Sequence, residues 1–265
     1  MKWISLLALE TPQLPDFERL AAWYARRYPD APPLVLSSRS DRLLTLVVGD
    51  DVVAVTLIGR PIPWAQLEGP AATAWYWPEA TERLRPHGAH LLTALAEDAG
   101  DPLPRAWLLT RMTAALAAAA PCTGVFWGPG RLVHPPQAYL AESAAADNDD
   151  LPLFLWVDFR VEQLDGDVVR LYTTGLEALG GLELEAPHFR GDPQTLLEYG
   201  YNLAHYQLAR KRSIGDGDTI ALTDAVQATA RRSPSLFGGD LEVIRLEFPD
   251  QDGSAPCRDK PAAAD

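Results

Sequence analysis

Short apolar runs with strand-like spacing and one stretch of helical spacing make up the beginning of the chain. The run at residues 3–9 predicts a strand, and PDFERLAAWYARRY (15–28) predicts an amphipathic helix with prolines near its start and stop. Three β-rich runs follow, PLVLSS, RLLTLVVG and DVVAVTLIG, and Gly49-Asp50-Asp51 between the last two is a hairpin signal. The predicted order is strand, helix and strands, the last two antiparallel.

The middle of the chain combines helical and extended patterns. We expect a helix over residues 72–84, a buried strand in AHLLTALAE (89–97) and a helix with one apolar stripe over residues 104–120. GVFWG predicts a short strand, and PPQAYLAESAA predicts a short helix that its prolines begin. The glycines of GVFWGPGRLVHPP indicate a turn before an edge strand.

The rest of the chain begins with a polar loop, AADNDD, at residues 145–150. Beyond it, LPLFLWVDFRVEQ and VVRLYTT predict an antiparallel pair joined across an Asp-Gly turn. DPQTLLEYGYNLAHYQLARKR (192–212) predicts a long helix with Asp192 as its N-cap and cations at its end. TIALTDAVQATARR and DLEVIRLEF predict two final strands.

These patterns predict an α+β fold with mixed, largely antiparallel sheets packed with several amphipathic helices. The acidic loop, residues 147–150 of AADNDD, divides an N-terminal half, residues 1–146, from a C-terminal half, residues 151–248. The C-terminal half is expected to pack on the first, and the two could equally form one single domain. Residues 249–265 have the composition of a disordered tail.

Composition narrows the classes of partner and compartment. The formal charge of −13 argues against nucleic acid and favours a basic protein partner, although solubility alone also explains an acidic surface. The two cysteines give no disulfide framework, which fits a reducing compartment. The short first apolar run lacks the features of a signal peptide, and no segment is apolar enough to cross a bilayer. We therefore expect a cytoplasmic protein without membrane contact.

The aromatic triplet Trp75-Tyr76-Trp77 is the most conspicuous candidate site. On the expected helix its rings spread around the axis, which favours a helix buried on several sides. Glu68 or Glu79 could then accept a hydrogen bond from an indole N–H. The other interpretation is a surface that binds a partner or a ligand, because aromatic side chains are enriched there too.

Other candidate motifs favour structural roles. Asp216-Gly217-Asp218 lacks the later ligands of a calcium loop and predicts a turn after the long helix. The scattered histidines have no zinc-site spacing, and the chain contains neither a glycine-rich phosphate loop nor a G-x-S-x-G elbow. We expect no cofactor, no metal and no catalytic residue.

Several stretches together resemble a bacterial family, domain of unknown function 4261 (DUF4261). They are LEGPAATAWYWPEA, GVFWGPGRLVHPPQAYL, LPLFLWVDFRVEQ, TTGLEALG and GDGDTIAL, and the resemblance spans about residues 40–248. It implies no catalytic residue. Similar acidic cytoplasmic proteins occur as immunity proteins, antidotes against toxins of contact-dependent or type VI secretion, which is an analogy and not a motif.

The hypothesis that follows is a noncatalytic immunity protein, an antitoxin that neutralises a toxin acting in the cytoplasm. A nuclease effector of type VI secretion suits it, because a basic nucleic-acid groove is attracted to an acidic surface. Asp147, Asp149 and Asp150 are candidates for the toxin-facing patch. The alternatives are an enzyme with a pocket near Trp75/Trp77/Glu79 and an adaptor for a secretion system. Exposed strand edges would also allow a homodimer.

Overall fold

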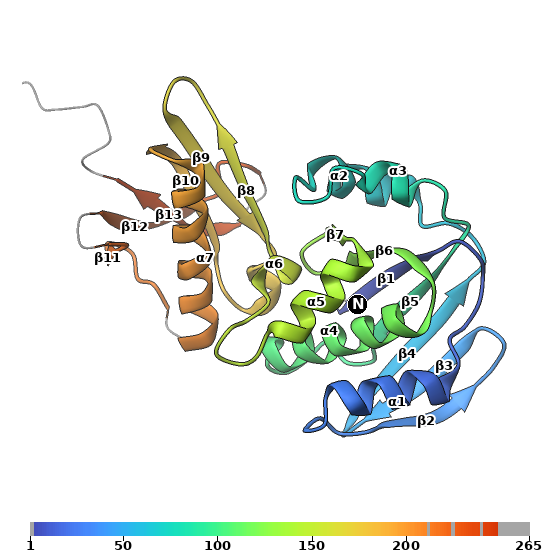
Figure 1. Cartoon of the computed structure of the whole chain (residues 1–265). Helices are drawn as coiled ribbons and strands as arrows, with labels where there is room; N and C mark the ends of the chain where they lie inside the picture. The colour runs from blue at the N-terminus through green and yellow to red at the C-terminus, as the bar shows by residue number, and fades with distance from the viewer. Residues whose placement is uncertain (1–2, 211–212, 224–225, 239–240, 249–265) are drawn as a thin grey trace, which may run out of the picture. The chain divides into compact units, whose positions relative to one another are not determined.

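The computed structural model describes residues 3–210, 213–223, 226–238 and 241–248 (Figure 1). The chain divides into two compact units. The first unit comprises residues 1–158, 173–181 and 204–212, and the second comprises residues 159–172, 182–203 and 213–265. The acidic loop that was expected to separate two halves lies within the first unit. The expected tail, residues 249–265, and the cations at residues 211 and 212 lie outside the described residues.

Within the described residues, the first unit contains a seven-stranded sheet whose recorded strand pairs are all antiparallel. Its order is β2 (Leu34–Arg39), β3 (Leu43–Val48), β4 (Asp51–Ile58), β5 (Ala89–Leu95), β1 (Ile4–Leu9), β6 (Cys122–Trp127) and β7 (Leu132–His134). The predicted hairpin is confirmed, because Val48 pairs with Asp51 and Gly49 adopts the positive φ of +62° that the tight turn requires. The edge strand β7 after the glycine turn is confirmed too.

Helices cover both faces of this sheet (Figure 1). On one face, α2 (Trp64–Thr73) and α3 (Ala80–Leu84) bury apolar side chains against Leu6 and Ala8 of β1. On the other, α4 (Pro102–Ala119) approaches β1 closely enough for the hydroxyls of Ser5 and Thr113 to hydrogen-bond at 2.6 Å. The remaining helical segments are α1 (Phe17–Arg27), α5 (Pro136–Ala145), α6 (Leu153–Trp156) and the 3₁₀ turn η1 (Glu177–Leu179).

Helix α4 is more deeply buried than its sequence indicates. Twelve of its 18 residues, all of which the structure describes, are buried, so the expectation of one apolar stripe was too narrow. Alanine explains the difference, because small side chains let neighbouring elements approach the helix from several directions. Helix α4 therefore packs against β1, β5, α1 and α5 together.

The second unit contains, among the described residues, a six-stranded sheet. Its order is β11 (Thr219–Ala221), β12 (Gln227–Pro234), β13 (Glu242–Glu247), β10 (Glu183–Arg190), β9 (Val168–Thr174) and β8 (Asp158–Gln163). Strands β10 and β13 pair in parallel, whereas the recorded registers of β9–β10, β11–β12 and β12–β13 are antiparallel. The predicted α+β fold with largely antiparallel sheets is confirmed.

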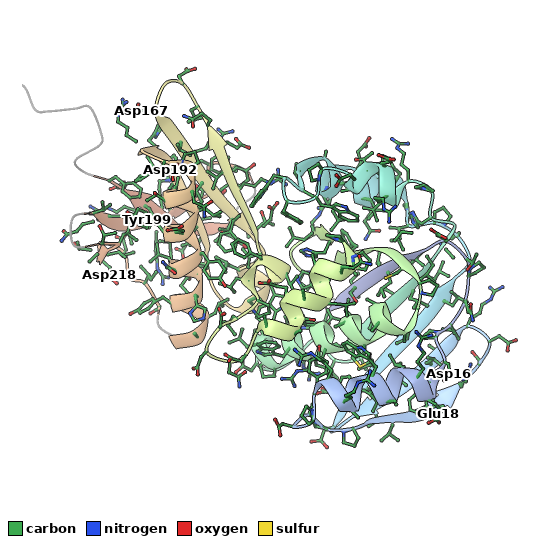
Figure 2. The ribbon with its side chains drawn as sticks, viewed as in Figure 1. Asp16, Glu18, Asp167, Asp192, Tyr199 and Asp218 are labelled. Carbon is green, nitrogen blue, oxygen red and sulfur yellow. The ribbon has the colours of Figure 1, made fainter. Side chains whose placement is uncertain are left out.

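Residues in the first half of helix α7 (Pro193–Arg210) contact strands of this second sheet. Asp192 accepts a hydrogen bond from the Thr195 N–H at 2.9 Å, which confirms the expected N-cap (Figure 2). A Cβ at Gly200 would lie 2.7 Å from Leu171 of β9, so glycine permits the close contact between helix and strand. The ring of Tyr199 meets Phe189 of β10 edge-on.

Three predicted elements were wrong. The first half of the expected strand LPLFLWVDFRVEQ forms α6, and only its second half is a strand, β8, because the period-two alternation begins only at Val157. The expected helix over residues 72–84 is two helices, α2 and α3, separated by a turn that holds the aromatic triplet. Pro78 accounts for the break, because a residue before proline is disfavoured in helical conformation. The expected strand over residues 219–232 is the hairpin β11–β12, in which the N–H of Leu222 donates to the carbonyl of Val226 at 2.9 Å. Among the described residues, no helix is long and apolar enough to cross a membrane.

Candidate functional site

The aromatic triplet lies in the turn between α2 and α3, which we call the aromatic turn (residues 74–79). Its three rings have different environments. Trp75 is 63% exposed and Tyr76 36%, whereas Trp77 is only 6% exposed and belongs to the core between the sheet and the two helices. The expectation of one buried helix was wrong, because the triplet supplies a core residue and a surface tryptophan at once.

The aromatic turn is held from beneath by Tyr76. Its hydroxyl donates to the carbonyl of Val133 at 2.9 Å, and its ring stacks on His134 with centroids 5.7 Å apart. Trp75 meets the Tyr76 ring edge-on at 5.7 Å, and the backbone N–H of Trp75 donates to the carbonyl of Thr73 at 2.9 Å. An exposed indole is thus presented on a well-supported base, which lowers the entropy cost of using it as a contact residue.

His134 is buried below the aromatic turn. One ring nitrogen, Nε2, lies 3.3 Å from the carbonyl oxygen of Leu155, and Tyr139 packs against the ring. Because a carbonyl only accepts, Nε2 carries the proton. Burial lowers the pKa of His134 to about 4, and the hydrogen bond to Leu155 opposes that change only in part. The imidazole is therefore neutral near pH 7 and supports Tyr76 as an uncharged, hydrogen-bonded ring.

The glutamates beside the aromatic turn are exposed. Within the part of the chain that the structure describes, neither Glu68 nor Glu79 accepts a hydrogen bond from an indole N–H, so the expected pairing was wrong. Exposed carboxylates gain as much from water as from such a bond. Glu79 instead lies at the start of α3.

The acidic loop, residues 147–150, follows α5 and is exposed throughout. Asp147 is used internally, because its Oδ1 accepts hydrogen bonds from the N–H groups of Asp149 and Asp150 at 2.8 and 2.9 Å. The carboxylates of Asp149 and Asp150 make no hydrogen bond or ion pair with any described residue. Of the three predicted aspartates, two therefore present free negative charge and the third shapes the loop.

The turn at Asp216-Gly217-Asp218 is confirmed as structural among the described residues. Asp218 accepts from the N–H of Gly215 at 2.7 Å, Asp216 accepts from the N–H of Arg232 at 3.0 Å, and Gly217 has a φ of +84°. Both carboxylates are thus occupied by backbone donors. In the residues that the structure covers, no three His, Cys, Asp or Glu side chains are grouped to hold a metal ion.

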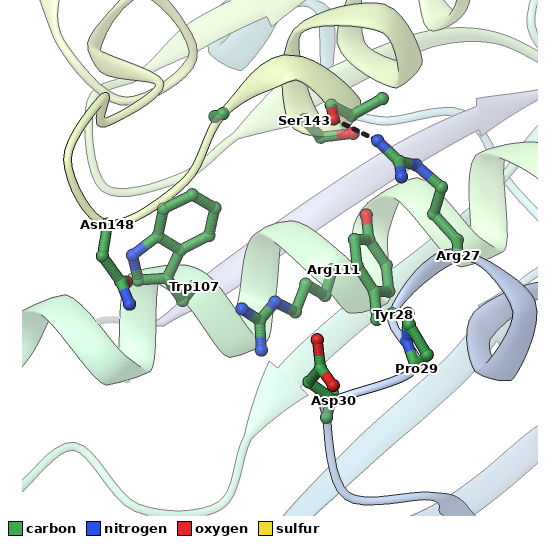
Figure 3. A pocket seen from close by; sticks show the side chains of 11 residues that line it. Arg27, Tyr28, Pro29, Asp30, Trp107, Arg111, Ser143 and Asn148 are labelled. Atoms are coloured by element: carbon green, nitrogen blue, oxygen red, sulfur yellow. Dashed lines mark hydrogen bonds between the residues drawn. The ribbon is translucent and has the colours of Figure 1, made fainter.

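Sequence reasoning missed a pocket in the first unit, which we call the arginine pocket (Figure 3). It has a volume of about 380 Å³, and its lining includes Arg27, Tyr28, Trp107, Arg111 and Asn148. None of Trp75, Trp77 and Glu79 lines it. One signal could have indicated it, because Arg111 is a charged residue in the middle of a helix that is otherwise mostly apolar.

The comparisons with known proteins concern mainly the second unit. Residues 172–247 match the model of the family DUF4261, a domain of unknown function. The predicted resemblance is confirmed for this DUF4261 segment, which contains the stretches TTGLEALG and GDGDTIAL, whereas the other three quoted stretches precede it. No curated protein and no solved structure gave a significant match. The aromatic turn, the acidic loop and the arginine pocket all lie outside the DUF4261 segment.

Proposed function

We propose that the protein is a noncatalytic immunity protein that binds and neutralises a basic bacterial toxin in the cytoplasm, a nuclease effector of type VI secretion. The observation that carries the proposal is the 63% exposure of Trp75 on a turn that Tyr76 holds in place. Exposed tryptophans that become buried in a partner are prominent among residues with large contributions to binding. A supported ring is suited to that role.

The charge of the chain supports a basic partner. The net charge is −13, and Asp149 and Asp150 carry carboxylates that no described residue neutralises. Long-range attraction between an acidic and a basic surface raises the association rate and is screened by salt. In this proposal the acidic loop steers the toxin, while Trp75 determines how long the complex lasts.

The test begins with capture of partners from the host lysate by the tagged protein at low and high salt, followed by identification by mass spectrometry. A captured basic protein is then expressed alone and together with this protein. We expect it to arrest growth alone and to be harmless in the pair. A captured protein that never arrests growth contradicts the antitoxin role and favours a secretion adaptor.

Variants separate the two proposed surfaces. Trp75→Ala is expected to raise the dissociation rate about 30-fold, the effect of losing about 2 kcal/mol. Val35→Ala removes another exposed apolar side chain, 53% exposed, from the edge strand β2 and serves as the control. Reversal of Asp149 and Asp150 to lysine should slow association, most at low salt. If Trp75→Ala and the unmodified protein dissociate at equal rates, the aromatic turn does not belong to the interface.

The expected homodimer stays a prediction. Within the described residues, β2 and β7 are the edge strands of the first sheet and β11 and β8 those of the second, and a second copy could extend any of these edges. Sedimentation of the purified chain over a range of concentrations shows directly whether it forms a dimer.

A further inference from the structure

The arginine pocket opens where the end of α1 meets α4, α5 and the loop that follows α5 (Figure 3). Its volume of about 380 Å³ lies within the range of roughly 300–1,000 Å³ that is common for small-molecule sites. The pocket is lined neither by Trp75 nor by the three aspartates of the acidic loop. The side chains proposed to bind a toxin therefore have no part in the pocket, and only Asn148 of the acidic loop borders it.

The charge of the pocket differs from that of the chain. Two cations, Arg27 and Arg111, and one anion, Asp30, line it, whereas the whole chain carries a net charge of −13. The acidic loop contributes Asn148, its one uncharged residue, to the lining. Cationic side chains gathered in a concave site of an acidic protein indicate a ligand that carries negative charge.

Arg111 is the central group of the pocket. Its guanidinium lies 5.5 Å from the ring centroid of Tyr28 and 5.4 Å from that of Trp107, and the side chain is partly buried. It makes no hydrogen bond or ion pair with any residue that the structure describes. The aromatic rings attract the cation but leave its five N–H donors without strong acceptors. Those donors are available to a ligand.

Arg27, the second cation of the pocket, is held in place by a contact with α5. Arg27 donates to the carbonyl of Ala144 in α5, which anchors its side chain across the pocket. Burial raises the pKa of Tyr28, an effect that Ser143 and the two guanidinium groups only partly offset. Tyr28 is therefore a neutral phenol near pH 7 and adds no negative charge. Asp30 is exposed and makes no ion pair with Arg111 among the described residues.

We propose that the arginine pocket binds a small oxyanion ligand, whose phosphate or carboxylate group is held by Arg111 and Arg27. The planar guanidinium group suits both chemistries, because two parallel N–H donors match two oxygens of either anion. The pocket is larger than a bare phosphate ion, so an organic ligand of low molecular weight can also place part of its body there. Such a ligand also joins α1, α4 and α5 through one set of contacts.

Isothermal titration calorimetry on the full chain tests the proposal in a buffer whose only other anion is chloride. The probes are inorganic phosphate and citrate, which separate the phosphate from the carboxylate source, and glucose is the neutral control. We expect saturable binding of phosphate or citrate and none of glucose. Arg111→Gln should weaken that binding about tenfold or more, as expected when charge-assisted hydrogen bonds are lost.

Two further variants make the result specific. Arg19→Gln makes the same change of charge on an exposed position of α1 outside the pocket and should bind as the unmodified protein does. Arg111→Lys keeps the charge but loses the bidentate geometry, and it should bind several-fold more weakly even if Arg111→Gln fails to fold. The proposal is overturned if neither anion binds saturably at millimolar concentration, or if the Arg111 variants bind as tightly as the unmodified chain.

Discussion

Acidification should destabilise the protein through His134. Burial lowers its pKa to about 4 in the folded state, against about 6.5 in an unfolded chain, so the folded protein binds fewer protons between these values. The contribution of His134 to the free energy of unfolding is therefore fully present above pH 6.5. It decreases as the pH drops from 6.5 towards 4, and it changes no further below pH 4. The interval corresponds to about 3 kcal/mol, because each pH unit is worth about 1.4 kcal/mol.

Urea unfolding at several pH values between 7 and 4 measures this loss, with His134→Phe as the reference variant. The phenylalanine keeps a ring beneath Tyr76 but does not titrate, so the free energy of unfolding should depend less steeply on pH. Other groups, including His90, whose pKa is also lowered mainly by burial, contribute equally to both proteins. Parallel pH dependences for the two proteins, or a His134 pKa near 6.5 by NMR, would refute the reasoning.

Four substitutions test the packing when the free energy of unfolding is measured in urea, and the first two compare a core tryptophan with a surface tryptophan. Trp77→Ala should cost about 3–5 kcal/mol, whereas Trp75→Ala should change stability by no more than about 0.5 kcal/mol, and similar losses would contradict the division of the aromatic turn. Gly124→Ala places a Cβ against Leu84 and should cost about 1–3 kcal/mol through overpacking, so a neutral result would mean that α3 shifts freely. The buried indole N–H of Trp156 donates to the hydroxyl of Thr110, so Thr110→Val removes its acceptor and should cost about 1–3 kcal/mol. No change would show that this N–H finds another partner.

The sequence predicted those elements whose signals are local. Strand β1, the β3–β4 hairpin and the Asp192 cap of α7 each depend on a few neighbouring residues, and each is present in the structure. Pro78 was also a local signal, and its effect on the preceding residue predicts the break between α2 and α3. The helical spacing of the flanking apolar residues concealed that break.

The candidate sites depended on contacts between distant segments, which a sequence pattern does not encode. Trp75 and Trp77 are chemically identical and two residues apart, and only the position of α3 on the sheet decides which ring is buried. The sequence analysis assigned no role to Arg111. Its neighbour Tyr28 comes from the end of α1, 83 positions earlier in the chain, so the pocket forms only when both helices pack together.

The parallel pairing of β10 with β13 has a consequence for synthesis on the ribosome. Glu183 pairs with Val243, so one edge of β10 has no neighbour until about 60 more residues have been translated. At about 5–20 residues per second, that delay is several seconds. An unpaired strand edge attracts other chains, so the nascent protein is most vulnerable to aggregation and to chaperone binding in this interval. The DUF4261 segment completes its sheet only after β13 has left the ribosomal tunnel.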